Sequence, residues 1–130
     1  MRIHRSIPGV LALTGAALLA PGAVLADAAQ ATAVAVQHAG FAADAGDLAG
    51  AQRHLHHVLN CLVGPEGEGF DQAAGNPCAQ PGGAIPQTSD AAMTEKLQKI
   101  AASVRAALGN DDVAAAKAAA ADARKMLAGE

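Results

Sequence analysis

Three of the five histidines in this 130-residue chain lie within one short segment, Arg53–Cys61, together with one of its two cysteines. At helical spacing, His54, His57 and Cys61 line up at positions i, i+3 and i+7 along the flank of an apolar stripe. His56 points to a different side of such a helix. Neutral imidazoles are good ligands for Cu(II), Zn(II) and Ni(II). The segment therefore predicts a candidate metal site on the side of a helix.

A fourth histidine, His38, lies on the other side of a predicted turn near Gly46. His38 and His54 are about equally far from this turn in sequence, so at about 1.5 Å per residue both lie roughly 11 to 13 Å from it on facing helices. His57 follows one helical turn after His54. We therefore expect His38, His54 and His57 to bind one divalent transition metal ion, copper, zinc or nickel, with His56 peripheral. The alternatives are a buried, hydrogen-bonded His38 and histidines that are merely solvated.

The two cysteines, Cys61 and Cys78, allow two exclusive interpretations. They form a disulfide, which export would favour, or the thiolate of Cys61 completes the site of His54 and His57. A disulfide here would contribute about 3 kcal/mol in the chain-entropy model, which a core made largely of alanine would need. We expect the disulfide.

Residues 1–26 have the order of a secretory signal peptide. Two arginines form the charged start, an apolar run follows over residues 10–20, and Val24–Ala26 is a small-residue cleavage site. We expect cleavage before Asp27, a periplasmic or secreted protein, and no membrane anchor after cleavage. The whole chain has a formal net charge of −3, and loss of the two arginines makes the mature chain more acidic, a weak bias toward cationic ligands.

The remaining residues, 27–130, are expected to form one all-α domain. Apolar residues at helical spacing predict four helices, over residues 28–45, 48–63, 89–108 and 113–127. The predicted fold is an up-down-up-down four-helix bundle of two helical hairpins, 28–63 and 89–128. A long disulfide-stapled loop, residues 64–88, joins the hairpins.

Particular residues should fix these elements. Asp47 is expected to cap the second helix, and Ser89 or Asp90 the third. Phe70 and Ile85, the large apolar residues of the loop, should pin it onto the helices. The expected apolar stripe of the first helix is Val34, His38, Phe41 and Ala45.

The two hairpins also look like copies of each other. Aligning Asp47 with Asp112 without gaps matches the turn before each helix, and it pairs the three histidines with Ser103, Ala119 and Asp122. Packing alone therefore does not require imidazole at these positions.

Composition and motifs argue against several other functions. With 2% aromatic residues and no basic stripe, we expect no nucleic-acid partner. No Ser-His-Asp set, paired carboxylates or phosphate-binding loop is present, so we expect no enzyme. The chain has no CxxCH motif, which excludes covalent c-type haem. Haem held without a covalent bond, by a histidine and Met93 or Met126, stays an alternative, although two Phe offer few rings to pack on a porphyrin.

A second alternative comes from a different class of protein. The bundle would then be structural or would bind a protein partner through loop 64–88, and its histidines would be incidental. Metal content after purification without a His tag separates this alternative from metal binding.

The first hairpin, from Gln37-His38-Ala39 through Asp47 to His54-Leu55-His56-His57, resembles small metal-binding proteins exported by some bacteria, in which alanine-rich helical hairpins repeat a His-Ala pattern. The resemblance covers residues 31–62. It implies a periplasmic four-helix bundle that binds divalent metals. This chain departs from the pattern, because its second hairpin has no histidine and its long Cys-containing loop is foreign to it, and these departures leave one site at most.

Overall fold

The computed structural model describes residues 21–130, with side chains from Asp27 onward, and its only regular elements in this range are helices. No strand occurs within these residues, which confirms the prediction of an all-α protein. The helices are α1 (Pro21–Ala43), α2 (Leu48–Val63), α3 (Ala84–Gln87), α4 (Ala91–Leu108) and α5 (Val113–Ala128).

The predicted signal peptide, residues 1–26, lies largely outside the described residues, so it stays a prediction. The first helix nevertheless begins earlier than expected, at Pro21 instead of Ala28, and it ends at Ala43. Proline is favoured at the first position of a helix because its missing N–H would have no partner there and its φ is already helical.

Aspartate side chains cap the N-termini of three of the long helices. Asp47 accepts a hydrogen bond from the backbone N–H of Gly50 at 2.7 Å, and Asp90 accepts one from Met93 at 2.7 Å. Asp112 does the same for α5. Each carboxylate satisfies an amide that has no partner within the helix and lies at the positive end of the helix dipole. The predicted starts of the second, third and fourth long helices are therefore confirmed.

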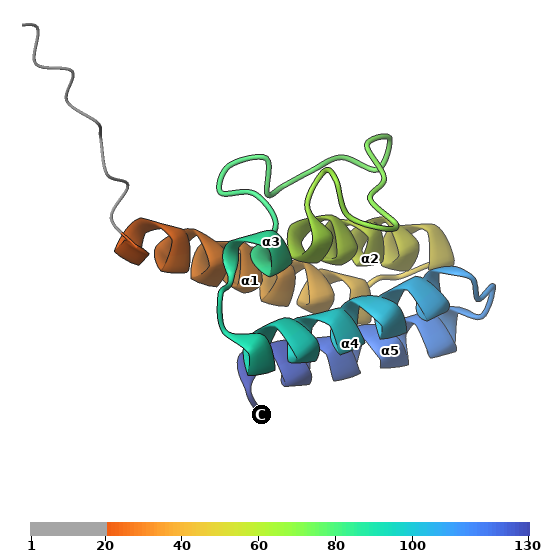
Figure 1. The fold of residues 1–130 in the computed structure, drawn as a ribbon. Coiled ribbons are helices and arrows are strands. Elements are labelled where there is room, and N and C mark those ends of the chain that lie inside the picture. Colours follow the sequence, from red (N-terminus) through yellow and green to blue (C-terminus); the bar gives the residue numbers. More distant parts are fainter. Residues whose placement is uncertain (1–20) are drawn as a thin grey trace, which may run out of the picture.

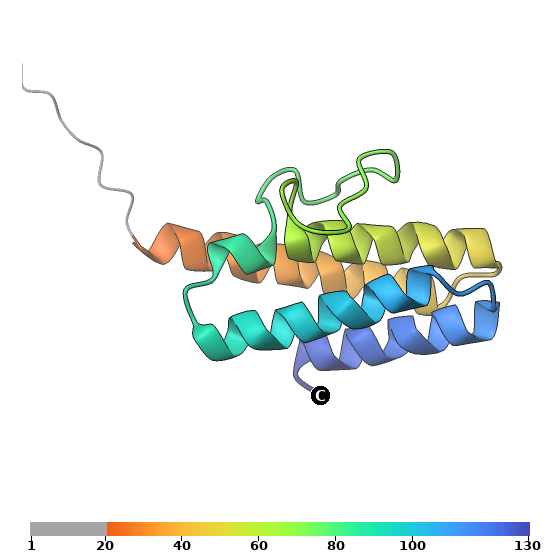
Figure 2. The same ribbon diagram turned by 45° about the vertical axis from the view of Figure 1, so that its right-hand side comes forward.

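The four long helices pack side by side in pairs (Figure 1 and Figure 2). α1 lies against α2 and α5, and α4 lies against the same two helices. α3 packs on α1 and α2 and leads into α4. The connection between α1 and α2 is short, so these two helices are close neighbours along most of their length.

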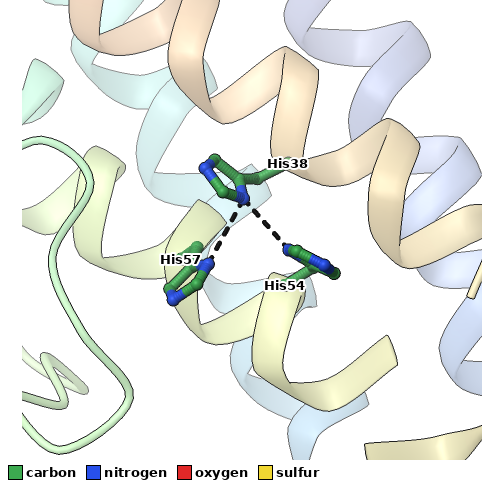
Figure 3. A group of neighbouring side chains, drawn as sticks. All are labelled: His38, His54 and His57. Carbon is green, nitrogen blue, oxygen red and sulfur yellow. Dashed lines mark hydrogen bonds between the residues drawn. The ribbon is translucent and has the colours of Figure 1, made fainter. Parts of the chain in front are cut away.

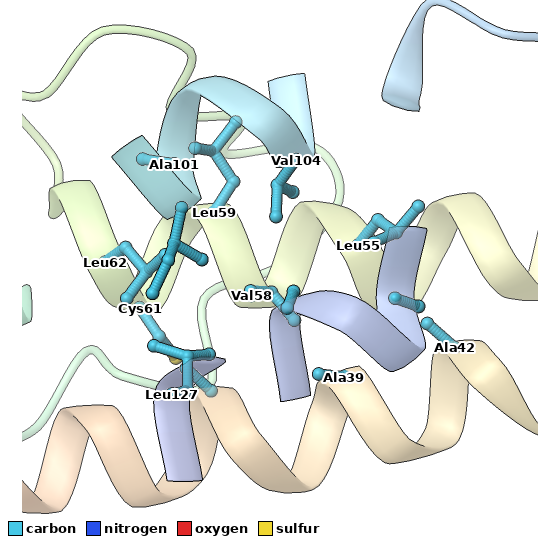
Figure 4. Packing of buried hydrophobic residues seen from close by; sticks show 14 of the residues in the cluster. Ala39, Ala42, Leu55, Val58, Leu59, Cys61, Leu62, Ala101, Val104 and Leu127 are labelled. Carbon is cyan, nitrogen blue, oxygen red and sulfur yellow. The ribbon is translucent and has the colours of Figure 1, made fainter. Parts of the chain in front are cut away.

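The side of α1 that packs into the core is made almost entirely of alanine. On α1 the buried side chains are Ala28, Ala31, Ala35, Ala39 and Ala42. The large buried groups come from α2 and α4, and Figure 4 shows Ala39 and Ala42 as small side chains beside Leu55 and Val58. Large apolar residues at helical spacing in α2 and α4 are buried, among them Leu55, Leu59, Leu97 and Ile100.

The predicted apolar stripe of the first helix does not form the buried face of α1. Val34 and His38 are only half-buried, and Phe41 is 46% exposed. The alanine face packs inward because small side chains let neighbouring backbones approach closely, and this leaves the larger residues of α1 on the flank.

The predicted loop, residues 64–88, is more ordered than expected. It ends in α3, and Phe70 and Ile85 pack against the core as predicted. Cys61 and Cys78 form a disulfide with a Cα–Cα distance of 5.1 Å. Cys61 is therefore not a thiolate ligand, and the bond is typical of a protein that folds in an oxidising compartment.

None of the helices in residues 21–130 combines the length and the apolar character that a membrane crossing requires.

Reducing the disulfide should lower the melting temperature by about 10 °C or more. The bond closes a loop of 17 residues, worth about 3 kcal/mol in the chain-entropy model, in a domain of about 100 residues. Thermal unfolding followed by circular dichroism, with and without a dithiol reductant, measures the change. The double variant Cys61→Ala/Cys78→Ala is the control, because its melting temperature should not respond to the reductant.

Candidate metal centre

Three histidine side chains from two helices converge between α1 and α2 (Figure 3). His38 comes from α1, and His54 and His57 come from successive turns of α2. The Nδ1 atom of His38 lies 3.1 Å from Nδ1 of His54 and 3.2 Å from Nδ1 of His57. The structure thus brings together the three histidines that the sequence selected, and the same ring nitrogen of each faces the others.

The positions of these histidines follow from the helix geometry. His54 and His57 are three residues apart, so they lie on one flank of α2, beside the buried stripe that contains Leu55 and Val58. His38 precedes Ala39, a buried member of the alanine face, and is placed at the edge of that face. Because this face permits a close approach of α1 to α2, the imidazole of His38 reaches those of α2.

An aromatic side chain borders the group on one side. The ring of Phe41 lies edge-on to that of His38, with centroids 5.5 Å apart, and its centroid is 5.3 Å from that of His54. All three histidines are half-buried. Their surroundings are therefore drier than those of a surface histidine, while one side stays accessible to solvent.

This environment favours the neutral form of His38 and His54. Burial, followed by the proximity of His57 and then of His54, lowers the pKa of His38 from 6.5 to about 4. Burial, followed by His57 and Arg53, lowers the pKa of His54. A proton on either ring would be poorly hydrated and would repel any positive charge on the neighbouring rings. Neutral imidazole is the form that binds metal ions.

A backbone carbonyl fixes the orientation of His57. Its Nε2 lies 2.7 Å from the carbonyl oxygen of Ala74, so Nε2 carries a proton and donates it. In the neutral ring Nδ1 then has a free lone pair, and this is the nitrogen that faces His38. Hydrogen bonds of this kind commonly orient metal-binding histidines and raise their basicity.

Asn60 holds the loop segment that supplies this carbonyl. Its side chain is fully buried, its Nδ2 donates to the carbonyl oxygens of Asp71 and Gly75 at 2.8 and 2.7 Å, and its Oδ1 accepts from the amide of Asp71 at 2.9 Å. These three bonds pin both ends of the segment 71–75, and Ala74 lies between them. Helical spacing places Asn60 on the same side of α2 as His56, away from the apolar stripe, and gives no sign of this role. The loop folds over that side only in the tertiary structure.

His56 does not join the group. Its Nδ1 lies 3.7 Å from a carboxylate oxygen of Asp71, in contact with the loop. The positions that the repeat pairs with His38 and His57, Ser103 and Asp122, are exposed, so packing at those places does not need a large ring. In the part of the chain with described side chains, the three histidines are the one group of potential metal ligands.

Acid should destabilise the metal-free protein before its carboxylates titrate fully. Between about pH 6.5 and 4 the unfolded chain takes up a proton at His38, whereas the folded protein does not, because its pKa is lowered to about 4. The free energy of unfolding should therefore fall as pH is lowered through this window. Urea unfolding at a series of pH values measures it, and the variant His38→Gln should show a smaller fall than the wild type. Equal falls in both proteins would contradict the lowered pKa.

Replacing Asn60 by Ala should loosen the loop and free the ring of His57. The change leaves loop backbone groups without partners, at a cost of about 1–3 kcal/mol, and should weaken metal binding about 10–100-fold. Nitrogen NMR of the histidine rings should show that His57 loses its preference for a proton on Nε2. Gln52→Ala is the control, because Gln52 is on the same helix but donates to Asn110 in the turn before α5 instead of to the loop. An unchanged His57 tautomer in Asn60→Ala would contradict the role.

Comparison of the chain with protein-family models, with curated proteins and with solved structures gives no match in any of the three. The resemblance of residues 31–62 to exported metal-binding proteins therefore stays a prediction.

Proposed function

We propose that this protein is an exported helical protein that binds one divalent transition metal ion through Nδ1 of His38, His54 and His57, for sequestration or delivery. The observation that carries the proposal is the convergence of three Nδ1 atoms at separations of 3.1 and 3.2 Å for the two closest pairs. Three potential ligand atoms from two helices lie within 4.8 Å of one another, which is close enough for one metal ion to contact all three.

These two separations match the distance between two ligand nitrogens that are bound to the same metal ion. Two nitrogens, each about 2.0–2.1 Å from a metal ion, are about 2.9 Å apart at a right angle and about 3.3 Å apart at the tetrahedral angle. The observed separations lie between these values. For these two pairs, a metal ion could replace the Nδ1···Nδ1 hydrogen bonds with little change in the separation of the nitrogens, once the ring hydrogens lie on Nε2. The lowered pKa values of His38 and His54 mean that neither ring is a cation that has to release a proton at neutral pH.

Imidazole nitrogens suit copper, zinc and nickel. A given set of nitrogen ligands binds Cu(II) more tightly than Ni(II) or Zn(II), so Cu(II) is expected to show the highest affinity in vitro. The Cys61–Cys78 disulfide supports export, and we assign the protein to the periplasm or the extracellular space.

We infer that the framework of the site is an up-down-up-down bundle of the hairpins 28–63 and 89–128. The short connections between α1 and α2 and between α4 and α5 support antiparallel neighbours. The packing of α1 and α4 against the same two helices supports a four-helix arrangement. The metal site then belongs to the first hairpin alone.

The alternative functions have less support. A partner-binding loop would need apolar groups on its outer surface, but Phe70 and Ile85 are used against the core. For haem, Met93 lines a groove with Ala28 and Thr32, at a part of α1 more than one helical turn away from His38. Phe70, Ile85 and Met93 are thus used elsewhere in the fold.

Titration of Cu(II) and Zn(II) into the tag-free mature protein should show one binding site per chain. Replacing His54 by Ala removes one of three ligands, so it should weaken binding more than the about 10–100-fold typical of a lost second-layer contact. His56→Ala is the matched control, because His56 is on the same helix and outside the group, and its affinity should stay close to that of the wild type.

Equal losses in His54→Ala and His56→Ala would indicate diffuse binding to surface histidines instead of one site. Absence of binding heat at micromolar protein would overturn the proposal and favour a structural or partner-binding bundle.

A further inference from the structure

We propose that a metal ion held by His38, His54 and His57 keeps one coordination position for a small monodentate ligand from outside the chain, on the side where Phe41 lies. This inference rests on the proposed metal binding. It adds a second binding event at the same site, with ligands of a defined class: water, hydroxide, and small anions or single donor groups such as azide or the imidazole of another molecule.

The first step is a count of donor atoms. Among the residues with described side chains, three histidines form the group, and each contributes one ligand atom. Cys61 is held in the disulfide, and His56 is turned toward Asp71. Structural zinc sites use four protein ligands, whereas sites with three leave the fourth position to water or a substrate. The three histidines of this chain would therefore leave the fourth position to a ligand from outside.

The second step is to find the side on which the position lies. On the side of His57 the loop segment 71–75 closes the site, because Nε2 is bonded to Ala74 and Gly75 lies so close that a Cβ there would be 3.4 Å from the same nitrogen. The side of His38 and His54 is bordered by Phe41, whose ring lies against both imidazoles and which is 46% exposed.

Phe41 cannot fill the position itself. A phenyl ring offers no donor atom to a transition metal, so it shields the ion without coordinating it. An external ligand would therefore enter beside a half-exposed apolar ring, which admits small donors and disfavours large polar ones. A molecule that takes over the metal could also bind the ion at this open position while the three histidines still hold it.

The test uses the wild-type mature protein loaded with one equivalent of Cu(II) and freed of unbound metal, with copper per chain measured first. Sodium azide is then titrated while the azide-to-copper charge-transfer absorption is recorded. We expect this band to saturate at one azide per copper with the copper still bound to the protein. Electron paramagnetic resonance of the same samples should change in step with the band.

A variant can supply the fourth metal ligand from the chain itself. Phe41→His places a fourth imidazole beside His38 and His54, and it should abolish the azide band and slow the loss of copper to a chelator. Ala33→His adds a histidine to an exposed position of α1 away from the site, and it should leave both measurements unchanged.

The outcomes separate this inference from the proposed function. A wild-type protein that holds one copper and shows no azide band has a closed coordination sphere, which overturns the inference and leaves metal binding intact. Removal of copper by azide, without a ternary complex, also overturns it. Failure of the wild type to hold one copper overturns both.

Discussion

The close approach of α1 to α2 across a face of alanines is the constraint on which the rest of the structure depends. Each alanine on this face buries little apolar area, so the face contributes less to stability than a leucine face would. What it provides is proximity, because helix separation is set by the side chains at the contact. With leucine at Ala39 or Ala42, α1 would be displaced and His38 would move away from the nitrogens of α2. The small side chains of this face therefore explain both the light core and the proximity of the histidines.

The loop after α2 completes the site and compensates for the light core. The disulfide ties it to the end of α2, Asn60 holds the segment 71–75, and Arg105 of α4 donates to the carbonyl of Glu68 at 3.0 Å. Three of the residues that anchor this loop, His57, Asn60 and Cys61, lie on little more than one turn of α2. The same short stretch of helix thus supplies a potential ligand, orients it, and fixes the covalent link.

Much of the architecture and the three histidines could be predicted from local patterns, and the rest depends on tertiary contacts. Capping aspartates and helical spacing predicted the starts of α2, α4 and α5, and counting residues from the turn placed His38 opposite His54. The buried face of α1 could not be recognised in this way, because alanine occurs on every side of that helix and larger residues such as Phe41 appeared to mark the core. Asn60 looked like an outward polar residue, and only the folded loop buries it. The carbonyl of Ala74 carries no side-chain signal at all.

The connection between α1 and α2 has a consequence for how the chain tolerates change. Four residues, 44–47, separate the end of α1 from the start of α2, and Asp47 fixes where α2 begins. A residue inserted or deleted here would have to be absorbed within the turn, because a shift of α2 by one residue would rotate it by about 100° and turn Leu55 and Val58 out of the core. Four residues leave little room for such an adjustment. The outer part of the long loop, by contrast, can change in length without altering this register. The length of this turn thus helps to keep His38 at the level of His54 and His57 along the two helices.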